Sequence, residues 1–564
     1  MILPKIWGEG ELFAPSALDF SGPAEEGVRY GDDFAGYLTG GCVGVRFFTE
    51  PRRTLLFPAA QPDGVRFEAV TSDYIEYYFP GNDRPFRLLF AGPHLLVGDC
   101  SEENLPEQTG GEDALTALLL DGTRFAYAWD AASPKKALRL AGEGMSADLD
   151  ALAASRRAFY AENCPSDTAP YAELRAKCLS VMRTQLYCPE GAFTRRWSTP
   201  DRLPHRHLWL WDSVFHAVGF RRFDPGLAGE LLLSAFARQT PSGFIPHLQK
   251  PGSGSAITQP PLLAWGAWEL YESGAGTKLL REVYEKNARF LGWLREHRRG
   301  RFAKENGLLL FSWHASRAEH CRCDESGMDN SPRFDTANPL AAVDLCCFYA
   351  NECAHMEKIA RVLGLEPDAG RWAAEFARAR ADIDRFLWSE ADGFYFDYDL
   401  RRKAPRKVWS VASFLPLFAG LSDGAQTEAL VAHLTDPALF WTPLPVPSVA
   451  RTDATFGSDM WRGPVWINYD YLIIRGLRRA GREDLAASLR CRLLDETDRL
   501  YRETGCLFEF YDSECERAPM ELNRKGPARF PYDPDVKMQT IRDYGWTTTL
   551  VFEMIGEKGF LPQN

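Results

Sequence analysis

Two acidic clusters, far apart in the chain, have the residue types that acid–base chemistry on an acetal needs. Residues 325–333 hold Glu325 and Asp329 around a glycine turn, and residues 508–512 hold Glu509 among aromatic side chains. A carboxyl group in apolar surroundings tends to have a shifted pKa, which suits a proton donor or acceptor. Two such groups are sufficient to hydrolyse a glycosidic bond, since one protonates the leaving oxygen and the other activates water.

Two aromatic clusters have the composition of sugar-binding segments. They read Trp209-Leu210-Trp211-Asp212 and Trp461-Arg462-Gly463-Pro464-Val465-Trp466. Indole rings offer flat apolar faces with one polar edge, which suit stacking on a sugar ring. Each segment also has a purely structural interpretation. Asp212 would be a helix N-cap, and Arg462 would form a buried ion pair. The acids of residues 325–333 would be surface charges paired with arginines.

The composition indicates a large soluble protein and excludes some classes of partner. The chain has 564 residues, 45% of them hydrophobic and 25% charged, with a formal net charge of −12. A chain this acidic is not expected to bind nucleic acid. It has no apolar run long enough for a membrane span, and its N-terminus lacks a signal-peptide pattern. We therefore expect a cytoplasmic protein of two or more domains.

The cysteines do not form a regular framework. There are 13 of them, an odd number, so we expect mostly reduced thiols. His320, Cys321 and Cys323 lie close together, but no second pair follows at a zinc-like spacing. We expect no metal ion and no cofactor.

The pattern along the chain predicts a β-rich part followed by a helical part. Residues 1–142 contain short alternating runs between Gly, Pro and Asp turns, typical of an antiparallel β-sandwich, at residues 44–48, 55–57, 65–70, 74–79 and 87–90. Residues 143–167 form a helical linker, with its helix at residues 146–163. From residue 168 to 564 the periodicity predicts helices at residues 171–186, 226–239, 262–273, 277–297, 340–363, 371–388, 425–434, 465–480 and 482–497.

A recurring sequence pattern suggests that the helical part is built from a repeated unit. A helix, an acidic turn with glycine and an extended aromatic stretch recur at residues 305–311, 390–399 and 503–512. Paired helices of this kind can close into a toroid with a funnel at one end, or continue as an open solenoid.

The four clusters, in this order on a helical array, resemble the inverting α-glycosidases built on an (α/α)6 barrel. These are glycoside hydrolase family 63 and its mannosylglycerate- and glucosylglycerate-hydrolase relatives, with trehalases more distant. The resemblance covers residues 168–560. It implies a mainly α fold, with the general acid at Asp329 and the base at Glu509. Trp209-Leu210-Trp211-Asp212 matches a sugar-binding motif of the family, and Tyr544-Gly545-Trp546-Thr547 resembles its closing motif.

From the resemblance and the chemistry we expect release of a terminal α-linked glucose or mannose by single displacement with inversion. The two carboxyl groups would then stand about 6.5–9.5 Å apart, with a water molecule between them. Glu325 would raise the pKa of Asp329 by like-charge repulsion. Besides the two catalytic residues, we expect the following side chains to bind substrate: Trp209, Trp211, Asp212, His216, Gln259, Glu325, Asn330, Arg333, Trp461, Arg462, Trp466, Tyr511 and Trp546.

Three alternatives remain open at this point. A phosphorylase would need basic residues around the base position, and a non-catalytic carbohydrate-binding protein would keep the cleft without turnover. A purely structural helical scaffold does not explain why acids and tryptophans gather in loops. The leaving group is open too: another sugar, or a small acid such as glycerate held by Arg206, Arg333 or Arg462. The oligomeric state and any structural calcium are also open.

Overall fold

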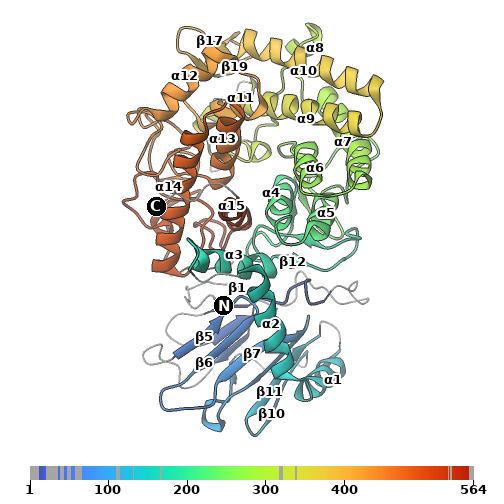
Figure 1. The fold of residues 1–564 in the computed structure, drawn as a ribbon, viewed down its shortest axis with the longest axis vertical. Helices are drawn as coiled ribbons and strands as arrows, with labels where there is room; N and C mark the ends of the chain where they lie inside the picture. The colour runs from blue at the N-terminus through green and yellow to red at the C-terminus, as the bar shows by residue number, and fades with distance from the viewer. Residues whose placement is uncertain are drawn as a thin grey trace.

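The structure is a computed structural model, mostly helical with a sheet region near the N-terminus (Figure 1). It describes residues 12–20, 36–38, 44–47, 53–56, 66–109, 115–130, 133–164, 168–316, 322–336, 339–530, 532–533 and 536–557. Within these residues, no helix is both long enough and apolar enough to cross a bilayer.

The N-terminal region contains two antiparallel sheets. The five-stranded sheet has the order β1 (Leu12–Phe13), β2 (Gly36–Leu38), β3 (Gly44–Phe47), β4 (Arg53–Leu56) and β9 (Glu107–Thr109). The six-stranded sheet has the order β10 (Thr116–Asp121), β11 (Arg124–Trp129), β8 (Leu95–Asp99), β7 (Phe86–Gly92), β6 (Tyr74–Tyr78) and β5 (Arg66–Val70). Phe13 and Leu55 from the first sheet share one hydrophobic cluster with Tyr77 and Phe125 from the second. Each predicted run coincides with a strand; the outer residues Phe48, Phe57 and Val65 of these runs lie outside the described residues.

Two helices, not one, connect the sheets to the helical part. α1 (Pro134–Met145) begins at the N-cap Ser133 and packs on β8, β10 and β11. α2 (Leu149–Asn163) begins at Asp148, whose side chain accepts a hydrogen bond from the Ala151 N–H, and it contacts β7. The predicted helix at residues 146–163 corresponds to α2. α1 was not predicted, and it begins inside the region expected to be β-rich.

One set of helices is buried on nearly every side: α4 (Leu210–Phe220), α6 (Leu263–Glu272), α9 (Val343–Val362), α11 (Leu415–Ala419), α13 (Ile467–Arg479) and α15 (Gly545–Gly556). Each packs on the next in this order, and α15 packs on α4, so the series of contacts closes on itself. An open helical solenoid is therefore wrong, because its first and last helices would not touch.

A second set lies outside the first: α3 (Ala172–Thr184), α5 (Pro225–Ser234), α7 (Thr277–His297), α10 (Glu366–Phe386), α12 (Gly424–Thr435) and α14 (Glu483–Thr504). α3 packs on α15, α5 on α4, α7 on α6, α10 on α9 and α14 on α13. The predicted helices coincide with this outer set and with α6, α9 and α13. α11 and α15 are missing from the prediction, and of α4 only a possible helix start at Asp212 was considered. These three helices are buried along almost their whole length, so they lack the polar face of an amphipathic helix.

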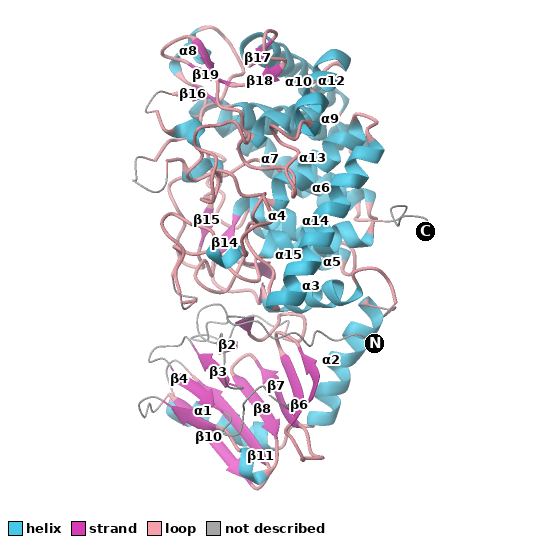
Figure 2. Cartoon of the chain, turned by 90° about the vertical axis from the view of Figure 1, so that its left-hand side faces the viewer, coloured by secondary structure: helices cyan, strands magenta, loops and turns pink. Residues whose placement is uncertain are grey.

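Short elements connect the helices. They are α8 (Arg301–Glu305) and the strands β12 (Leu186–Tyr187), β13 (Trp197–Ser198), β14 (Leu208–Trp209), β15 (Leu248–Gln249), β16 (Leu340–Ala341), β17 (Trp388–Ser389), β18 (Phe394–Tyr395), β19 (Asp397–Asp399) and β20 (Ala404–Arg406). Figure 2 shows the long loops gathered with β14 and β15 on one side of the helical part.

The repeated turns of the sequence share one backbone conformation. Gly307, Gly393 and Gly505 have φ values of 67°, 59° and 75°. A residue with a side chain adopts this left-handed region only at a cost. Gly307 and Gly505 follow the ends of α8 and α14, whereas Gly393 lies in the turn between the paired strands β17 and β18.

Buried ion pairs join the sheets to the helices. Arg183 of α3 donates to Asp73 from Nε at 2.9 Å and from Nη2 at 2.7 Å, and it also binds Asp19 at 2.6 Å. Arg156 of α2 contacts the same two carboxylates. Arg183 and Arg156 come from the helices and the acids from the N-terminal region, so the network connects the two regions.

Candidate active site

The loops that precede the buried helices surround a cavity that is open to solvent on one side. Its walls are formed by His205, Trp209, Trp211, Asp212, Gln259, Gly327, Asp329, Met460, Trp461, Trp466, Glu509, Arg524, Lys525, Lys537, Tyr544 and Trp546. These residues lie just before or within the first turns of α4, α6, α9, α13 and α15, or in the segment between α14 and α15. The closed helix contacts thus bring together residues that are more than 300 positions apart.

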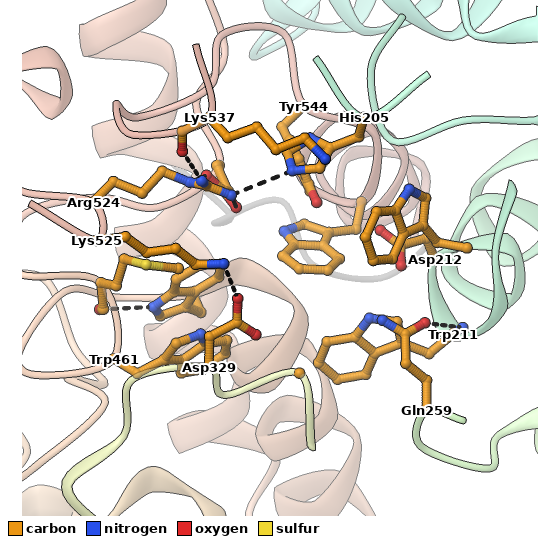
Figure 3. A pocket seen from close by; sticks show the side chains of 16 residues that line it. His205, Trp211, Asp212, Gln259, Asp329, Trp461, Arg524, Lys525, Lys537 and Tyr544 are labelled. Carbon is orange, nitrogen blue, oxygen red and sulfur yellow. Dashed lines mark hydrogen bonds and ion pairs between the residues drawn. The ribbon is translucent and has the colours of Figure 1, made fainter. Parts of the chain in front are cut away.

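A tight loop positions Asp329. Gly327 has a φ of 72°, and its backbone lies so close to Trp211 that a Cβ atom there would stand 2.4 Å from the indole ring. The Asp329 carbonyl accepts hydrogen bonds from the N–H groups of Arg322 and Cys323, at 2.7 and 3.1 Å. The side chain points into the cavity, where its Oδ2 lies 2.6 Å from the ammonium of Lys525 (Figure 3).

Glu509 lies in a second buried ion pair. Its carboxylate accepts from Nε of Arg524 at 2.6 Å and from Nη2 at 3.0 Å, and both side chains are almost fully buried. Its backbone N–H is fixed by the carbonyl of Ile541. Arg524 also lies 3.4 Å from Nε2 of His205, whose Nδ1 is 2.5 Å from Asp201 (Figure 3). Because arginine stays protonated, this bidentate pair contains Glu509 as a carboxylate, the form that a general base needs.

Aromatic rings form much of the wall. Trp461 and Trp466 stack with their centroids 3.9 Å apart and an angle of 5° between their planes. Trp546 meets Trp211, Trp466 and Tyr544 edge-on. Among the residues that the structure describes, the buried indole N–H groups of Trp209, Trp461 and Trp546 have no hydrogen-bond partner. Unpaired donors beside flat apolar faces are suited to the hydroxyl oxygens and ring of a sugar.

Asp212 is the least satisfied carboxyl group of the cavity wall. Burial raises its pKa well above the ordinary range, and the charges of Asp201 and Glu509 add to this effect. Its Oδ1 has no hydrogen-bond partner within the described part of the chain. The N-cap position of α4 is Trp209, so Asp212 does not cap the helix. The structural interpretation considered for this residue is therefore wrong.

Several residues expected to bind substrate do not line the cavity. Glu325 binds Arg298 at 2.5 Å and accepts from the backbone N–H groups of Thr258 and His314. Arg333 binds Asp344 and Asp397, both at 2.7 Å, and is fully buried. Glu325 is already paired with an arginine, and this corrects the expectation that it would act on Asp329 by like-charge repulsion.

Four more residues that were expected to bind substrate lie outside the cavity wall. Asn330 accepts from the Trp461 N–H, and Arg462 donates to the Asn330 carbonyl and to Asp335. Tyr511 accepts from the Phe508 N–H through its hydroxyl group. His216 lies 2.8 Å from the Ser198 hydroxyl, and burial lowers the pKa of this histidine to about 3. These four side chains position the cavity rather than line it.

The cationic side of the cavity was not predicted. Arg206, Arg333 and Arg462 were the candidates for positive charge, whereas the wall contains Arg524, Lys525 and Lys537. His205, Gly327, Met460 and Tyr544 were not expected as site residues either. The only local signal is the run Arg524-Lys525-Gly526-Pro527, which resembles an ordinary surface turn. Of the considered zinc cluster, His320 and Cys321 lie outside the described residues, and Cys323 is buried.

Carboxylates and tryptophans around one cavity, at the ends of packed helices, are the site architecture of a glycoside hydrolase. Comparison with known proteins gives the family. Residues 205–547 match the model of the mannosylglycerate hydrolase MGH1-like glycoside hydrolase domain. This match spans more than half of the chain, so the chain belongs to that family.

The individual proteins that the chain resembles share only about a quarter of their aligned residues with it. The chain is similar to a mannosylglycerate hydrolase of Rubrobacter radiotolerans, 26% identical over 409 residues, covering 57% of this chain and 88% of that protein. It is also similar to the mannosyl-oligosaccharide glucosidase of Saccharomyces cerevisiae, 23% identical over 57% of this chain and 48% of that protein. The crystal structure of the GH63 mannosylglycerate hydrolase from Thermus thermophilus in complex with glucose superposes with a TM-score of 0.54. It is 24% identical and covers 67% of this chain and 99% of that chain, which shows a shared fold.

Proposed function

We propose that this protein is an inverting glycoside hydrolase that releases a terminal α-linked glucose or mannose. The observation that carries the proposal is the cavity itself, where Asp329 and Glu509 stand among tryptophans. The closed series of helix contacts supports an (α/α)6 toroid as the catalytic domain, expected at residues 168–564, and the shared cluster of the two sheets supports an N-terminal β-sandwich.

The reaction is a single displacement. Protonated Asp329 gives its proton to the glycosidic oxygen while the bond from that oxygen to the anomeric carbon breaks. A water oxygen bonds to the same carbon from the opposite face, and Glu509 takes the proton that this water loses. The products are the free sugar with inverted configuration and the alcohol of the leaving group, and solvent returns the proton from Glu509 to Asp329.

The terminal sugar belongs on the aromatic side of the cavity. Trp209, Trp211 and Trp546 offer ring faces there. Trp209 and Trp546 also offer N–H groups without a partner among the described residues, and Asp212 offers an oxygen to hydroxyl groups. The leaving group then meets Lys525 and Lys537, which suit an acid such as glycerate. The names of the relatives include both mannosylglycerate hydrolase and oligosaccharide glucosidase.

Phosphorolysis is the second candidate, because cations also suit inorganic phosphate. Arg524, the basic residue nearest Glu509, is occupied by that carboxylate in a bidentate pair, which favours water as the nucleophile. A phosphorylase would release a sugar 1-phosphate and depend on added phosphate.

A panel of α-glucosides and α-mannosides tests the proposal. It includes glucosylglycerate, mannosylglycerate, kojibiose, nigerose and trehalose, each incubated with and without phosphate. We expect free glucose or mannose from one member without phosphate, and proton NMR in the first minutes should show the inverted anomer. Sugar 1-phosphate would establish phosphorolysis, and retention of configuration would exclude single displacement.

Two carboxamide variants test the chemical roles. Asp329→Asn and Glu509→Gln should each lower kcat by about 100- to 10,000-fold, because each removes one proton-transfer group. Glu305→Gln is the matched control: its carboxylate is exposed, pairs with Arg301 and should be dispensable. Circular dichroism should be the same for all three, and a near-normal rate in either cavity variant would remove that residue from the chemistry.

A further inference from the structure

The proposed reaction does not use the ion pair between Lys525 and Asp329. The ammonium and Oδ2 are 2.6 Å apart, and the two side chains are 24% and 21% exposed, so substrate can reach both. Figure 3 shows the lysine reaching across the cavity to the carboxylate, above Trp461.

A fixed turn presents this lysine to the acid. Lys525 has a φ of 53°, an unusual value for a residue with a side chain, and Gly526 follows with a φ of 144°. The neighbouring Asn523 is bound through its backbone to Ser458 and Met460, at 2.9 and 3.2 Å. Arg524 is held by Glu509. The proposed base therefore anchors the turn that carries Lys525.

The ion pair and the proton transfer exclude each other. The pair exists only when Asp329 is a carboxylate, whereas a general acid must carry a proton. Three other titratable groups act on Asp329: Asp324, His247 and Arg524. Burial lowers the pKa of His247 to about 4, so this ring is neutral near pH 7, and Arg524 is already bound by Glu509. Lys525 is thus the cation in direct contact with the acid.

We propose that Lys525 makes the enzyme selective for substrates with an anionic leaving group, by releasing Asp329 only when such a group is bound. This inference rests on the proposed function. A carboxylate on the leaving group attracts the ammonium away from Asp329. The same negative charge then lies near Asp329 and favours its protonated form, so the acid takes up a proton from solvent. A neutral leaving group must break the pair without this compensation.

Two substrates that differ only in the charge of the leaving group test this role. Both contain the sugar that the enzyme releases in the panel. In one substrate this sugar is linked to glycerate, and in the other to glycerol, which replaces the carboxylate with a neutral CH2OH group. For the wild type we expect a higher kcat/KM with the glycerate glycoside. Lys525→Met should lower that value by about 10- to 100-fold and raise the value for the glycerol glycoside by about 3- to 10-fold, the range that one charged contact spans. Lys525→Arg, which keeps the cation, should retain the preference of the wild type.

Two further variants serve as controls. Lys407→Met removes a lysine that lies 2.6 Å from Asp392, far from the cavity, and should change neither substrate. Lys537→Met removes a cavity lysine for which the structure gives no contact with Asp329, so it should not raise turnover of the glycerol glycoside.

The outcomes distinguish this inference from the proposed function. If the wild type cleaves neither these substrates nor any member of the panel, the proposed function fails and the inference fails with it. If cleavage occurs but Lys525→Met lowers both substrates equally, or lowers only the glycerate glycoside, the hydrolase stands and the role of Lys525 in releasing the acid is overturned.

Discussion

At the scale of single residues, the three carboxyl groups of the cavity have three different environments. Asp329 faces a lysine, Glu509 is clamped by an arginine, and Asp212 is buried with an unpaired oxygen. We expect these different environments to suit different roles, since the proposed reaction needs both a proton donor and a proton acceptor in one site. We also expect Asp212 to bind substrate, because a buried polar atom without a partner is most easily satisfied by a ligand.

Substitution of Asp212 tests this assignment. Asp212→Ala should weaken binding of the released monosaccharide by about 10- to 100-fold, the cost of a lost buried hydrogen bond. Asp212→Asn should lose less, because burial keeps the pKa of Asp212 high and an amide resembles the neutral acid. Isothermal titration with glucose and mannose measures both variants. Wild-type affinity in the alanine variant would place the sugar elsewhere.

At the scale of elements, the loop before α9 places Asp329. Gly327 combines a positive φ with a backbone that touches Trp211, so an added methyl group has no room. Gly327→Ala should therefore shift the loop and lower kcat by about 10- to 100-fold, since misplacement of a catalytic group is costly even when the fold survives. Steady-state kinetics and circular dichroism measure the two effects. Gly307→Ala, at an open turn with the same backbone conformation, is the control and should keep the wild-type rate.

Glu352 of α9 caps the start of α6 from the neighbouring helix. Its carboxylate accepts from the N–H groups of Ala264 and Trp265, at 2.8 and 3.0 Å, and from Asn287. Burial raises the pKa of Glu352 to about 7, although these donors oppose the shift. The folded state therefore holds this proton over a range in which the unfolded chain has lost it. The resulting stability is complete below the ordinary glutamate pKa and is lost as pH rises through about 7.

Urea unfolding at about pH 5 and about pH 8 tests this linkage. Through Glu352 the wild type should lose up to about 3 kcal/mol of unfolding free energy between these values. Glu352→Gln should lack that part of the pH dependence. Glu357→Gln, at a partly exposed position of the same helix that pairs with Arg361, should keep it. Equal pH dependence in all three proteins would contradict the assignment.

Helices with one solvent-exposed face gave the clearest sequence pattern, although α6, α9 and α13 were also predicted while buried on nearly every side. α7, α10 and α14 alternate buried and exposed positions with a helical period, and the sequence places them within a few residues, apart from the last turns of α14. α4 and α15 are buried along almost their whole length. Their apolar runs carry no clear period. α15, which bears Trp546, was therefore not predicted, and α4, which bears Trp211 and Asp212, was considered only as a possible helix start at Asp212.

At the scale of the whole molecule, buried ion pairs join the sheets to the helices beside a shared apolar core. Arg183 and Asp73 are nearly inaccessible to solvent, at 2% and 0% exposed. Removal of one partner from a buried ion pair leaves the other charge without compensation. Arg183→Met should therefore lower the unfolding free energy by about 3–5 kcal/mol, as measured by urea unfolding. Arg139→Met, which breaks an exposed pair with Glu143, should cost about 0–1 kcal/mol. Similar losses in both variants would show that the junction depends on packing alone.

The sequence by itself determined the order of the regions, the outer helices, the tryptophans that line the cavity and the two carboxylates proposed for catalysis. These follow from local chemistry: periodicity, glycine turns and clusters of one residue type. Only the tertiary structure decided which charges face each other. Arg524 reaches Glu509 and Lys525 reaches Asp329 because the helix contacts close on themselves and bring distant loops to one cavity. The same closure places Glu325 and Arg333 outside the cavity wall. The sequence does not show this, because the identity of an ion-pair partner depends on distance in space and not on spacing in the chain.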